Sequence, residues 1–380
     1  MIQFSKDLNI NKLRMAFNND AVTFWSTSNL SPLYADVKIG THTLRLYPDP
    51  ENRFYINLKP YVQALINTRN FEDTLQPSIS GGFAGDYIFD FTEGTYLDTE
   101  VKFTITLSDN TVDTTIAHTI TWIAGVEQLS DYNALLKTDP LVLSPFKRHT
   151  ANHHYLKYWE GYPFDIQLYC PGNSITLKNE TTLLEQDFDV PGKVSRIVLS
   201  DGRTDETLEA FFPLVEGHNS IRIMASAQAS VNDKFLTLEK IPYRHGVYLK
   251  WLNKYGGYSY WLFEDTYSID RSTKQLGELD RDLNNLEDSF GRTIQLGKES
   301  QDNIKVIAEL LTEEERTVVE GLLDSLKIYL FTGRALSQSG RNSWVEVSLK
   351  TANSRIKNAR QPLTNFTFDL ELPQRFTQTL

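Results

Sequence analysis

The chain has 380 residues, of which 40% are hydrophobic and 23% are charged, and its formal net charge is −11 at pH 7. This length suggests about two or three domains, and the composition excludes a collagen-like or largely disordered chain. Because a surface that binds the nucleic-acid backbone is basic, the acidic balance argues against a protein that wraps nucleic acid.

The N-terminal residues and the cysteine content indicate where the protein is made. Residues 1–7 lack the apolar stretch of a signal peptide, and no apolar run reaches the ~18 residues that a membrane helix needs. Cys170 is the single cysteine, so no disulfide can form within the chain. We therefore expect a protein that is synthesised in a cytoplasm, is not exported by a signal-peptide route and has no membrane partner.

The first third of the chain has the alternating pattern of paired β-strands. Apolar and polar side chains alternate in residues 101–107, a Ser-Asp-Asn turn follows, and residues 116–123 alternate again. Residues 43–47 and 86–91 are further candidate strands, and residues 60–66 are a candidate short helix with a proline in its first turn. We predict an N-terminal β domain over residues 1–130.

The middle of the chain begins with a stretch that is typical of a linker. Residues 131–156 contain two prolines and several basic residues. After this stretch, short candidate strands are separated by turn residues; they are residues 175–177, 194–199 and 221–224. We predict a linker over residues 131–156 and a middle β domain over residues 157–245.

The last part of the chain combines an aromatic hairpin with a capped helix. Residues 246–263 read GVYLKWLNKYGGYSYWLF, which is two aromatic-rich strands around a glycine turn. Thr312 and Glu315 have the spacing of a helix capping box. The apolar residues after it repeat at helical spacing, namely Val318, Val319, Leu322, Leu323 and Leu326. We predict a helix over residues 312–326, followed by a strand over residues 327–331.

The predicted elements together indicate a fold class. Residues 246–380 form a C-terminal β domain that carries the helix, and the two preceding domains consist of short strands. The chain is therefore predicted to be mainly β, with tandem β-sandwich or barrel modules and one well-defined α-helix in the C-terminal unit.

The sequence contains no arrangement that is typical of an active site. Motifs for a nucleophile elbow, a phosphate loop and a dinucleotide site are missing from it. His149, His153 and His154 have the spacing of metal ligands, but the neighbouring Lys147 and Arg148 would repel a cation. We therefore expect no enzyme activity, no cofactor and no metal.

The C-terminal third resembles a known group of proteins. Its hairpin with a GGY turn is followed by a helix that begins LTEEE and by a KIYLF strand, and residues 53–62 add an aromatic strand that runs into a short helix. These segments resemble virion structural proteins of tailed bacteriophages that infect Bacteroidetes, the crAss-like group among them. The resemblance implies a structural component of the tail, hub or neck ring, made in the host bacterial cytoplasm and located in the virion. It implies no catalytic residues.

Such a role also implies partners. They would be other copies of the chain, arranged in a ring, and other tail or neck proteins of the virion. The resemblance implies no specific nucleic-acid binding, although DNA would pass through the lumen of a ring. Asp and Glu side chains on the wall of that lumen would repel phosphate, which lets DNA slide.

Two features of the sequence are candidate contacts between subunits. The aromatic face of the hairpin would either close a sandwich or meet a neighbouring subunit, where it would supply a buried anchor. The acid-rich residues 270–288, which we interpret as a solvated linker, would meet the basic residues 334–360 of a neighbouring copy. The candidate interface residues are Trp251, Tyr255, Tyr258, Trp261, Arg334, Arg355 and Arg360.

Two other functions stay open. A carbohydrate-binding or carbohydrate-cleaving β-protein would stack exposed Trp and Tyr on sugars, and cleavage would need two carboxylates ~5–10 Å apart. No pair of acids in the sequence is a clear candidate for that role. A host-binding module at the tail tip would still be a part of the virion.

Overall fold

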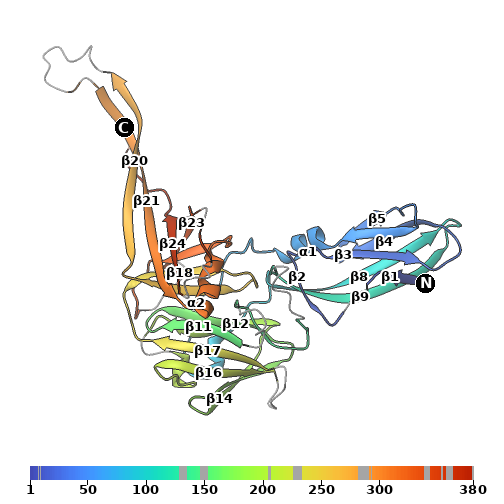
Figure 1. Ribbon diagram of the computed structural model, residues 1–380, viewed down its shortest axis with the longest axis horizontal. Helices are drawn as coiled ribbons and strands as arrows, with labels where there is room; N and C mark the ends of the chain where they lie inside the picture. The colour runs from blue at the N-terminus through green and yellow to red at the C-terminus, as the bar shows by residue number, and fades with distance from the viewer. Residues whose placement is uncertain are drawn as a thin grey trace.

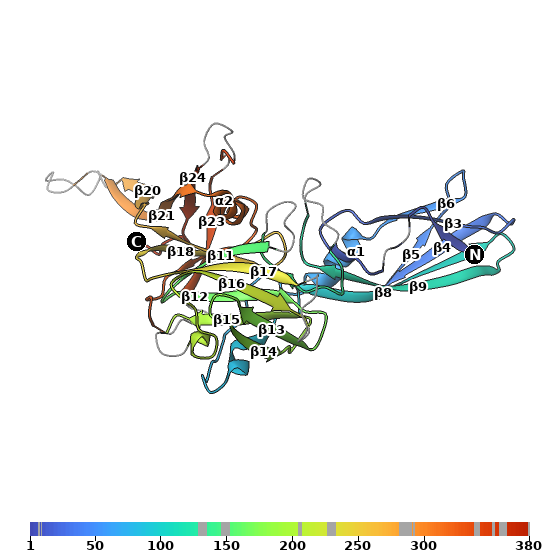
Figure 2. The same cartoon turned by 60° about the horizontal axis from the view of Figure 1, so that its bottom comes forward.

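The computed structural model describes residues 1–6, 8, 10–127, 135–145, 153–203, 207–225, 233–280, 291, 293–337, 343–351, 354–356 and 363–378. The chain is mainly β, as predicted, with its strands in five sheets. Figure 1 shows three parts: an N-terminal arm, a larger body, and a ribbon of two long strands that projects from the body. Figure 2, turned by 60°, shows the arm extending away from the body in the same way.

The arm is a β-sandwich. One sheet has the order β1 (Ile2–Phe4), β3 (Ala21–Ser26), β6 (Arg53–Asn57). The other has the order β2 (Leu13–Met15), β9 (Val112–Ile123), β8 (Tyr96–Leu107), β4 (Pro32–Ile39), β5 (His42–Leu46). Helix α1 (Lys59–Ile66) lies at the end nearest the body (Figure 1). The sheets pack around Phe24, Phe54, Phe103 and Trp122, and the predicted hairpin is confirmed in β8 and β9.

Two sheets of the body come mainly from the middle of the chain. The first has the order β10 (Leu141–Val142), β12 (Pro163–Tyr169), β15 (Val194–Asp201), β7 (Ile88–Asp90). The second has the order β11 (His153–Trp159), β17 (Lys234–Ile241), β16 (Gly217–Met224), β13 (Ser174–Asn179), β14 (Leu184–Asp189). The 3-10 turns η1 (Ala84–Tyr87) and η3 (Leu208–Ala210) lie beside the first sheet.

The third sheet of the body comes from the C-terminal part. Its order is β19 (Tyr258–Glu264), β18 (Gly246–Leu252), β22 (Ile328–Phe331), β23 (Trp344–Leu349), β24 (Thr364–Glu371), β21 (Thr293–Leu311), β20 (Tyr267–Asp280). The strand predicted directly after the helix is therefore confirmed as β22. The aromatic hairpin is confirmed as β18 and β19, which pair from Gly246↔Glu264 to Leu252↔Tyr258.

One hydrophobic core serves the whole body. It contains Tyr87 from the first third of the chain, Trp159 from the middle and Trp251 from the C-terminal part, so the predicted middle and C-terminal domains share a core. Three segments differ from the predicted boundaries. β7 belongs to the body although it falls within residues 1–130, β10 lies in the predicted linker, and β11 begins inside that linker at His153. Each of the three pairs with a strand that is not next to it in the chain, which a local pattern cannot show.

The predicted helix is present but shorter than predicted. The capping box is confirmed: the Glu315 N–H donates to Thr312 Oγ1 at 3.4 Å, and the Thr312 N–H donates to Glu315 Oε2 at 2.7 Å. However, α2 (Glu313–Val319) continues only as the 3-10 turn η5 (Glu320–Leu322). The predicted end at residue 326 is wrong.

The early end of the helix has a physical reason in the sequence. Gly321 lies in the last turn, and glycine weakens a helix interior by about 1 kcal/mol relative to alanine. The chain turns away after Leu322, so Leu326 is 72% exposed and does not belong to the buried stripe. In the part of the chain that the structure describes, no helix combines the length and the apolar character that crossing a membrane requires.

The buried stripe can be tested by substitution. Leu322→Ala should lower the free energy of unfolding by about 2–5 kcal/mol, because the side chain is fully buried and its removal leaves a cavity. Leu326→Ala is the matched control and should change it by less than about 0.5 kcal/mol. Urea unfolding followed by circular dichroism measures both. Equal losses for the two variants would contradict this packing.

Candidate functional site

The aromatic residues predicted to face a neighbour lie inside the chain itself. Trp251 is 0% exposed, Tyr255 1%, Tyr258 5% and Trp261 6%. The prediction that they form a surface anchor is therefore wrong. The hairpin is covered by the arm and by the sheets of the body, so its packing partners come from the same chain.

The turn of the hairpin joins the body to the arm. The Val126 N–H, at the end of the arm, donates to the Lys254 carbonyl at 2.7 Å. A Cβ on Gly256 would lie 2.9 Å from the carbonyl carbon of Ala124, and one on Gly257 would lie 2.9 Å from Leu143 Cβ. Gly256 also has a φ of +78°, which glycine adopts without strain. The GGY signal therefore reflects close packing within the chain.

The basic candidate residues have a different outcome. Arg334 and Arg355 are exposed, so both are available to a partner. Arg360 lies outside the described residues, as do residues 281–290 of the predicted acidic linker. The described part of that stretch is the strand β20, so the interpretation as a linker is wrong for residues 270–280.

β20 and β21 form the ribbon that projects from the body (Figure 1). They pair from Tyr267↔Val306 to Asp280↔Thr293, whereas β24 pairs with β21 only from Asn303 to Leu311. The outer half of the ribbon is therefore two-stranded. Every residue of β20 except Gly277 is exposed.

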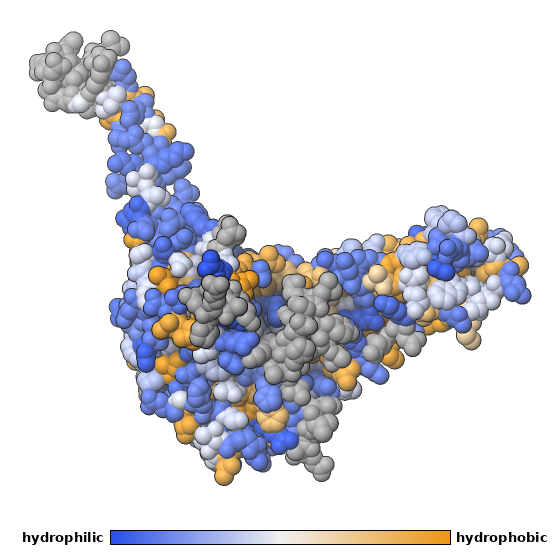
Figure 3. Space-filling view, viewed as in Figure 1, coloured by the Kyte–Doolittle hydropathy of each residue, from blue (hydrophilic) through white to orange (hydrophobic). Residues whose placement is uncertain are grey.

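The surface of the ribbon is mixed in character. Figure 3 shows it mainly hydrophilic, with apolar spots. The exposed apolar side chains of β20 are Ile269, Leu276 and Leu279. Asp302 accepts from Arg271 Nε at 2.7 Å and from Arg375 Nη1 at 2.8 Å, which ties β20, β21 and the C-terminal segment together.

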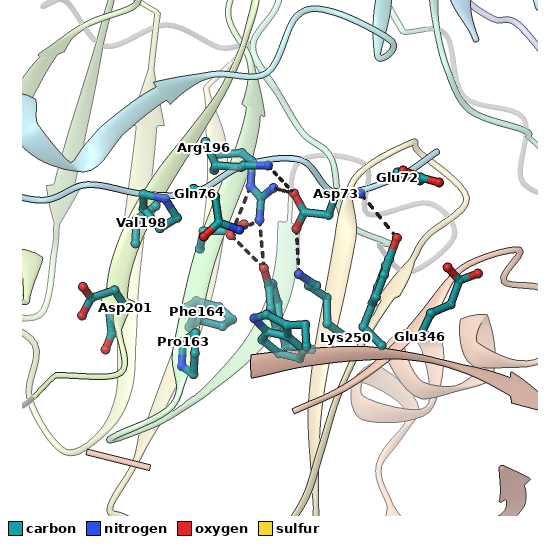
Figure 4. A pocket seen from close by; sticks show the side chains of 17 residues that line it. Glu72, Asp73, Gln76, Pro163, Phe164, Arg196, Val198, Asp201, Lys250 and Glu346 are labelled. Carbon is teal, nitrogen blue, oxygen red and sulfur yellow. Dashed lines mark hydrogen bonds and ion pairs between the residues drawn. The ribbon is translucent and has the colours of Figure 1, made fainter. Parts of the chain in front are cut away.

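A cluster of buried charges lies within the body, and we call it the charge cluster: Asp73, Asp165, Arg196 and Lys250. Asp73 precedes β7 in an extended segment, while the other three lie on β12, β15 and β18. Arg196 Nη1 donates to Asp73 Oδ1 and Lys250 Nζ donates to Asp73 Oδ2, each at 2.7 Å. Asp165 accepts from Arg196 and from Tyr260 Oη. Figure 4 shows Asp73 between Arg196 and Lys250.

The charge cluster perturbs the protonation of its members. Burial alone would raise the pKa of the Asp73 carboxyl, but the Arg196 and Lys250 cations outweigh burial and hold that pKa well below its ordinary value. Burial lowers the pKa of Lys250, and Asp73 opposes this. The guanidinium pKa of Arg196 would fall on burial, but Asp165 and Asp73 keep it above its ordinary value. Two anions and two cations thus balance in the interior, which is the condition for burying them.

A cavity of about 260 Å³ lies beside the charge cluster. Its walls include Glu72, Gln76, Asp201, Trp344 and Glu346 in addition to the cluster (Figure 4). The cluster carboxylates bind cations of their own chain. Among the described residues, no group of three or more His, Cys, Asp or Glu side chains could hold a metal ion.

The sequence analysis did not predict the charge cluster, although two of its members stand out in the sequence as cations within buried strands. Lys250 interrupts the apolar residues of β18, and Arg196 directly precedes the apolar run Ile197–Leu199 of β15; both strands are buried. A charge in such a strand is almost never fully buried without a partner, so each predicts a carboxylate elsewhere in the chain. No comparable pattern marks Asp73, because its segment has no regular structure.

Comparison with known proteins gives weak likenesses. No protein-family model matches the chain, and no curated protein matches it. Among solved structures, the chain is similar to fibronectin(III)-like modules of Clostridium thermocellum CbhA, with 10% identity, a TM-score of 0.19, and coverage of 63% of this chain and 95% of that one. It is also similar to a protein of unknown function from Porphyromonas gingivalis W83, with 12% identity, a TM-score of 0.18, and coverage of 63% and 99%. At these TM-scores the similarity identifies neither the fold family nor the function of this chain.

The close packing at the hairpin turn predicts that adding a methyl group to Gly256 destabilises the protein. Gly256→Ala should lower the free energy of unfolding by about 2–4 kcal/mol, because it adds both a clash with Ala124 and strain at a positive φ. Gly217→Ala is the matched control: its φ is +88° but nothing lies within 4 Å of the new Cβ, so only the backbone strain of about 1–2 kcal/mol is expected. Urea unfolding measures both, and equal losses would rule out the clash.

The charge cluster predicts a pH dependence. Because the folded-state pKa of Asp73 is lowered from 3.8, its ionised form stabilises the protein fully above that pH, and this contribution is lost as the pH falls below it. The stability difference between the wild type and Asp73→Asn should therefore be constant from about pH 5 to 7 and shrink on acidification below about pH 4. Urea midpoints across this range measure it, with Glu72→Gln as the control. A difference that grows on acidification would contradict the assignment.

Proposed function

We propose that this chain is a structural component of a tailed-phage virion, in the tail, hub or neck ring, and that it assembles with copies of itself and with other virion proteins. The observation that carries this proposal is the ribbon of β20 and β21, which projects from the body and exposes nearly all of β20. The resemblance of the hairpin and helix segments to virion structural proteins supplies the identity of the particle.

The physics of the ribbon favours a partner. A two-stranded hairpin is at best marginally stable in water on its own. The outer half of the ribbon has no third strand in the described structure, and Leu276 and Leu279 expose apolar surface there. Contact with a neighbouring chain would cover these side chains and stabilise the ribbon.

The proposed interface differs from the one that the sequence suggests. Because the aromatic hairpin is buried in the joint to the arm, the ribbon takes its place as the apolar contact. Arg334 and Arg355 remain candidate contacts, since both are exposed basic residues on an acidic chain. Charges at the rim of such an interface contribute orientation and selectivity more than affinity.

The interior of the body also favours a structural role over catalysis. The four members of the charge cluster bind one another, and Asp201 and Glu346 at the cavity bind Arg203 and Lys327. These acidic groups are therefore committed to ion pairs within the chain. We accordingly propose no enzyme activity, no cofactor, and a location in the virion after synthesis in the host bacterial cytoplasm.

The proposal can be tested by placing a charge on the ribbon. Leu276→Lys and Leu279→Lys should leave the isolated protein folded, because both side chains are exposed, but should reduce self-association and incorporation into particles by roughly tenfold or more. Sedimentation velocity and quantification of the protein in purified particles measure the two effects. Leu183→Lys, at an exposed turn of the body, is the matched control and should assemble normally.

Two outcomes would overturn the proposal. If both ribbon variants assemble like the wild type, the ribbon is not the interface. If the wild-type protein is missing from purified particles, the structural role fails. Glycan binding without self-association would then favour the carbohydrate-binding function.

A further inference from the structure

An extended segment links the arm to the body, and we call residues 71–79 the strap. It runs from the region after α1 to the region before η1 and forms neither helix nor strand. Its described contacts with the body are made to side chains: Tyr258 Oη donates to the Phe71 carbonyl at 3.1 Å, and Arg203 Nη2 donates to the Ile79 carbonyl at 3.2 Å. The Asp73 N–H donates to Tyr329 Oη at 3.4 Å.

The charged contact of the strap is the most buried of these. The side chains of Asp73, Arg196 and Lys250 are 5%, 4% and 6% exposed. Each oxygen of the Asp73 carboxylate accepts from a different cation, so the two cations clamp it from two elements, β15 and β18. Breaking a buried ion pair by removing one partner is strongly destabilising, because it leaves an uncompensated charge in the interior.

The two cations depend on Asp73 unequally. Arg196 also binds Asp165, which itself accepts from Tyr260. The Lys250 ammonium pairs with Asp73 and lies over aromatic rings, with the Trp344 centroid at 4.2 Å and the Tyr329 centroid at 5.1 Å. Asp165 and Arg196 also act on it electrostatically. Without Asp73, the cluster would hold two cations and one carboxylate.

We propose that Arg196 and Lys250 form a carboxylate-binding site, that Asp73 fills this site from within the chain, and that this contact latches the strap to the body. The site recognises a carboxylate by charge and by two donors on opposite sides of it, which is the geometry of charge-assisted binding. The cavity of about 260 Å³ beside the site gives a small carboxylate room to reach the two cations when the Asp73 side chain is removed. This inference concerns the chain alone and does not rest on the proposed function.

The test removes the Asp73 carboxylate by mutation and then supplies a free carboxylate in solution. In Asp73→Ala, the melting temperature should fall by roughly 5–15 °C, and backbone amides of residues 71–79 should exchange hydrogen faster, as measured by mass spectrometry. Sodium acetate or formate should then raise the melting temperature of this variant above its value in sodium chloride at the same ionic strength. The wild type should show no such difference, because its site is already filled.

Two further variants make the result decisive. Asp73→Asn keeps the side-chain volume without the charge, so it should show the faster exchange of the strap but no response to acetate. Glu72→Ala, at the neighbouring position of the same cavity, should resemble the wild type in both respects. If Asp73→Ala cannot be purified folded, recovery of folded protein only in acetate supports the site, and the Asp73→Asn exchange rates test the latch.

Specific results would overturn the inference. Equal melting temperatures of Asp73→Ala in acetate and in chloride would show that the two cations do not bind a free carboxylate. Unchanged exchange of residues 71–79 in both Asp73 variants would show that this contact does not hold the strap. An equal acetate effect on Glu72→Ala would show that acetate acts generally on the protein.

Discussion

The ion pairs of Asp73 with Arg196 and Lys250 bring three distant parts of the chain to one point. Arg196 lies in a sheet made mainly by the middle of the chain, Lys250 in the sheet made by its C-terminal part, and Asp73 in the segment that leaves the arm. A cation in the interior is costly unless a carboxylate accompanies it. The carboxylate of the strap therefore lowers the cost of packing the two sheets against each other, and both sheets contribute to the same hydrophobic core.

Two contacts fix the arm to the body, and the ion pairs of Asp73 are one of them. The arm has its own hydrophobic core, but the strap begins shortly after α1, and the glycine turn contacts Ala124 at the end of β9. The arm is thus fixed by an electrostatic contact on one side and by close backbone packing on the other.

The sequence predicted what is locally encoded. Three such signals are the alternation in β8 and β9, the GGY turn and the Thr312–Glu315 capping box. Each is formed by residues that are close together in the sequence, and the structure confirms all three. The sequence left open whether the aromatic face of the hairpin closes a sandwich or meets a neighbouring subunit, because an aromatic strand has the same pattern in both cases. The structure shows that Trp251 and Tyr258 are buried within the chain. The charge cluster escaped for a related reason: Asp73 is 123 residues from Arg196 and 177 from Lys250, and no spacing rule connects such positions.

The sequence did not predict the ribbon, because the charged residues of β20 are also typical of a solvated linker. Asp270, Arg271, Lys274 and Glu278 break the apolar alternation that usually marks a strand, yet a ribbon with both faces in solvent has no need of that alternation. The same charges, together with the irregular pairing around Gly277, are devices that discourage open-ended pairing at an exposed strand edge. An edge protected in this way does not recruit strands indiscriminately. Under the proposed function, a partner would recognise the ribbon through its exposed side chains, and assembly would stop at a defined number of neighbours instead of continuing as an open-ended sheet.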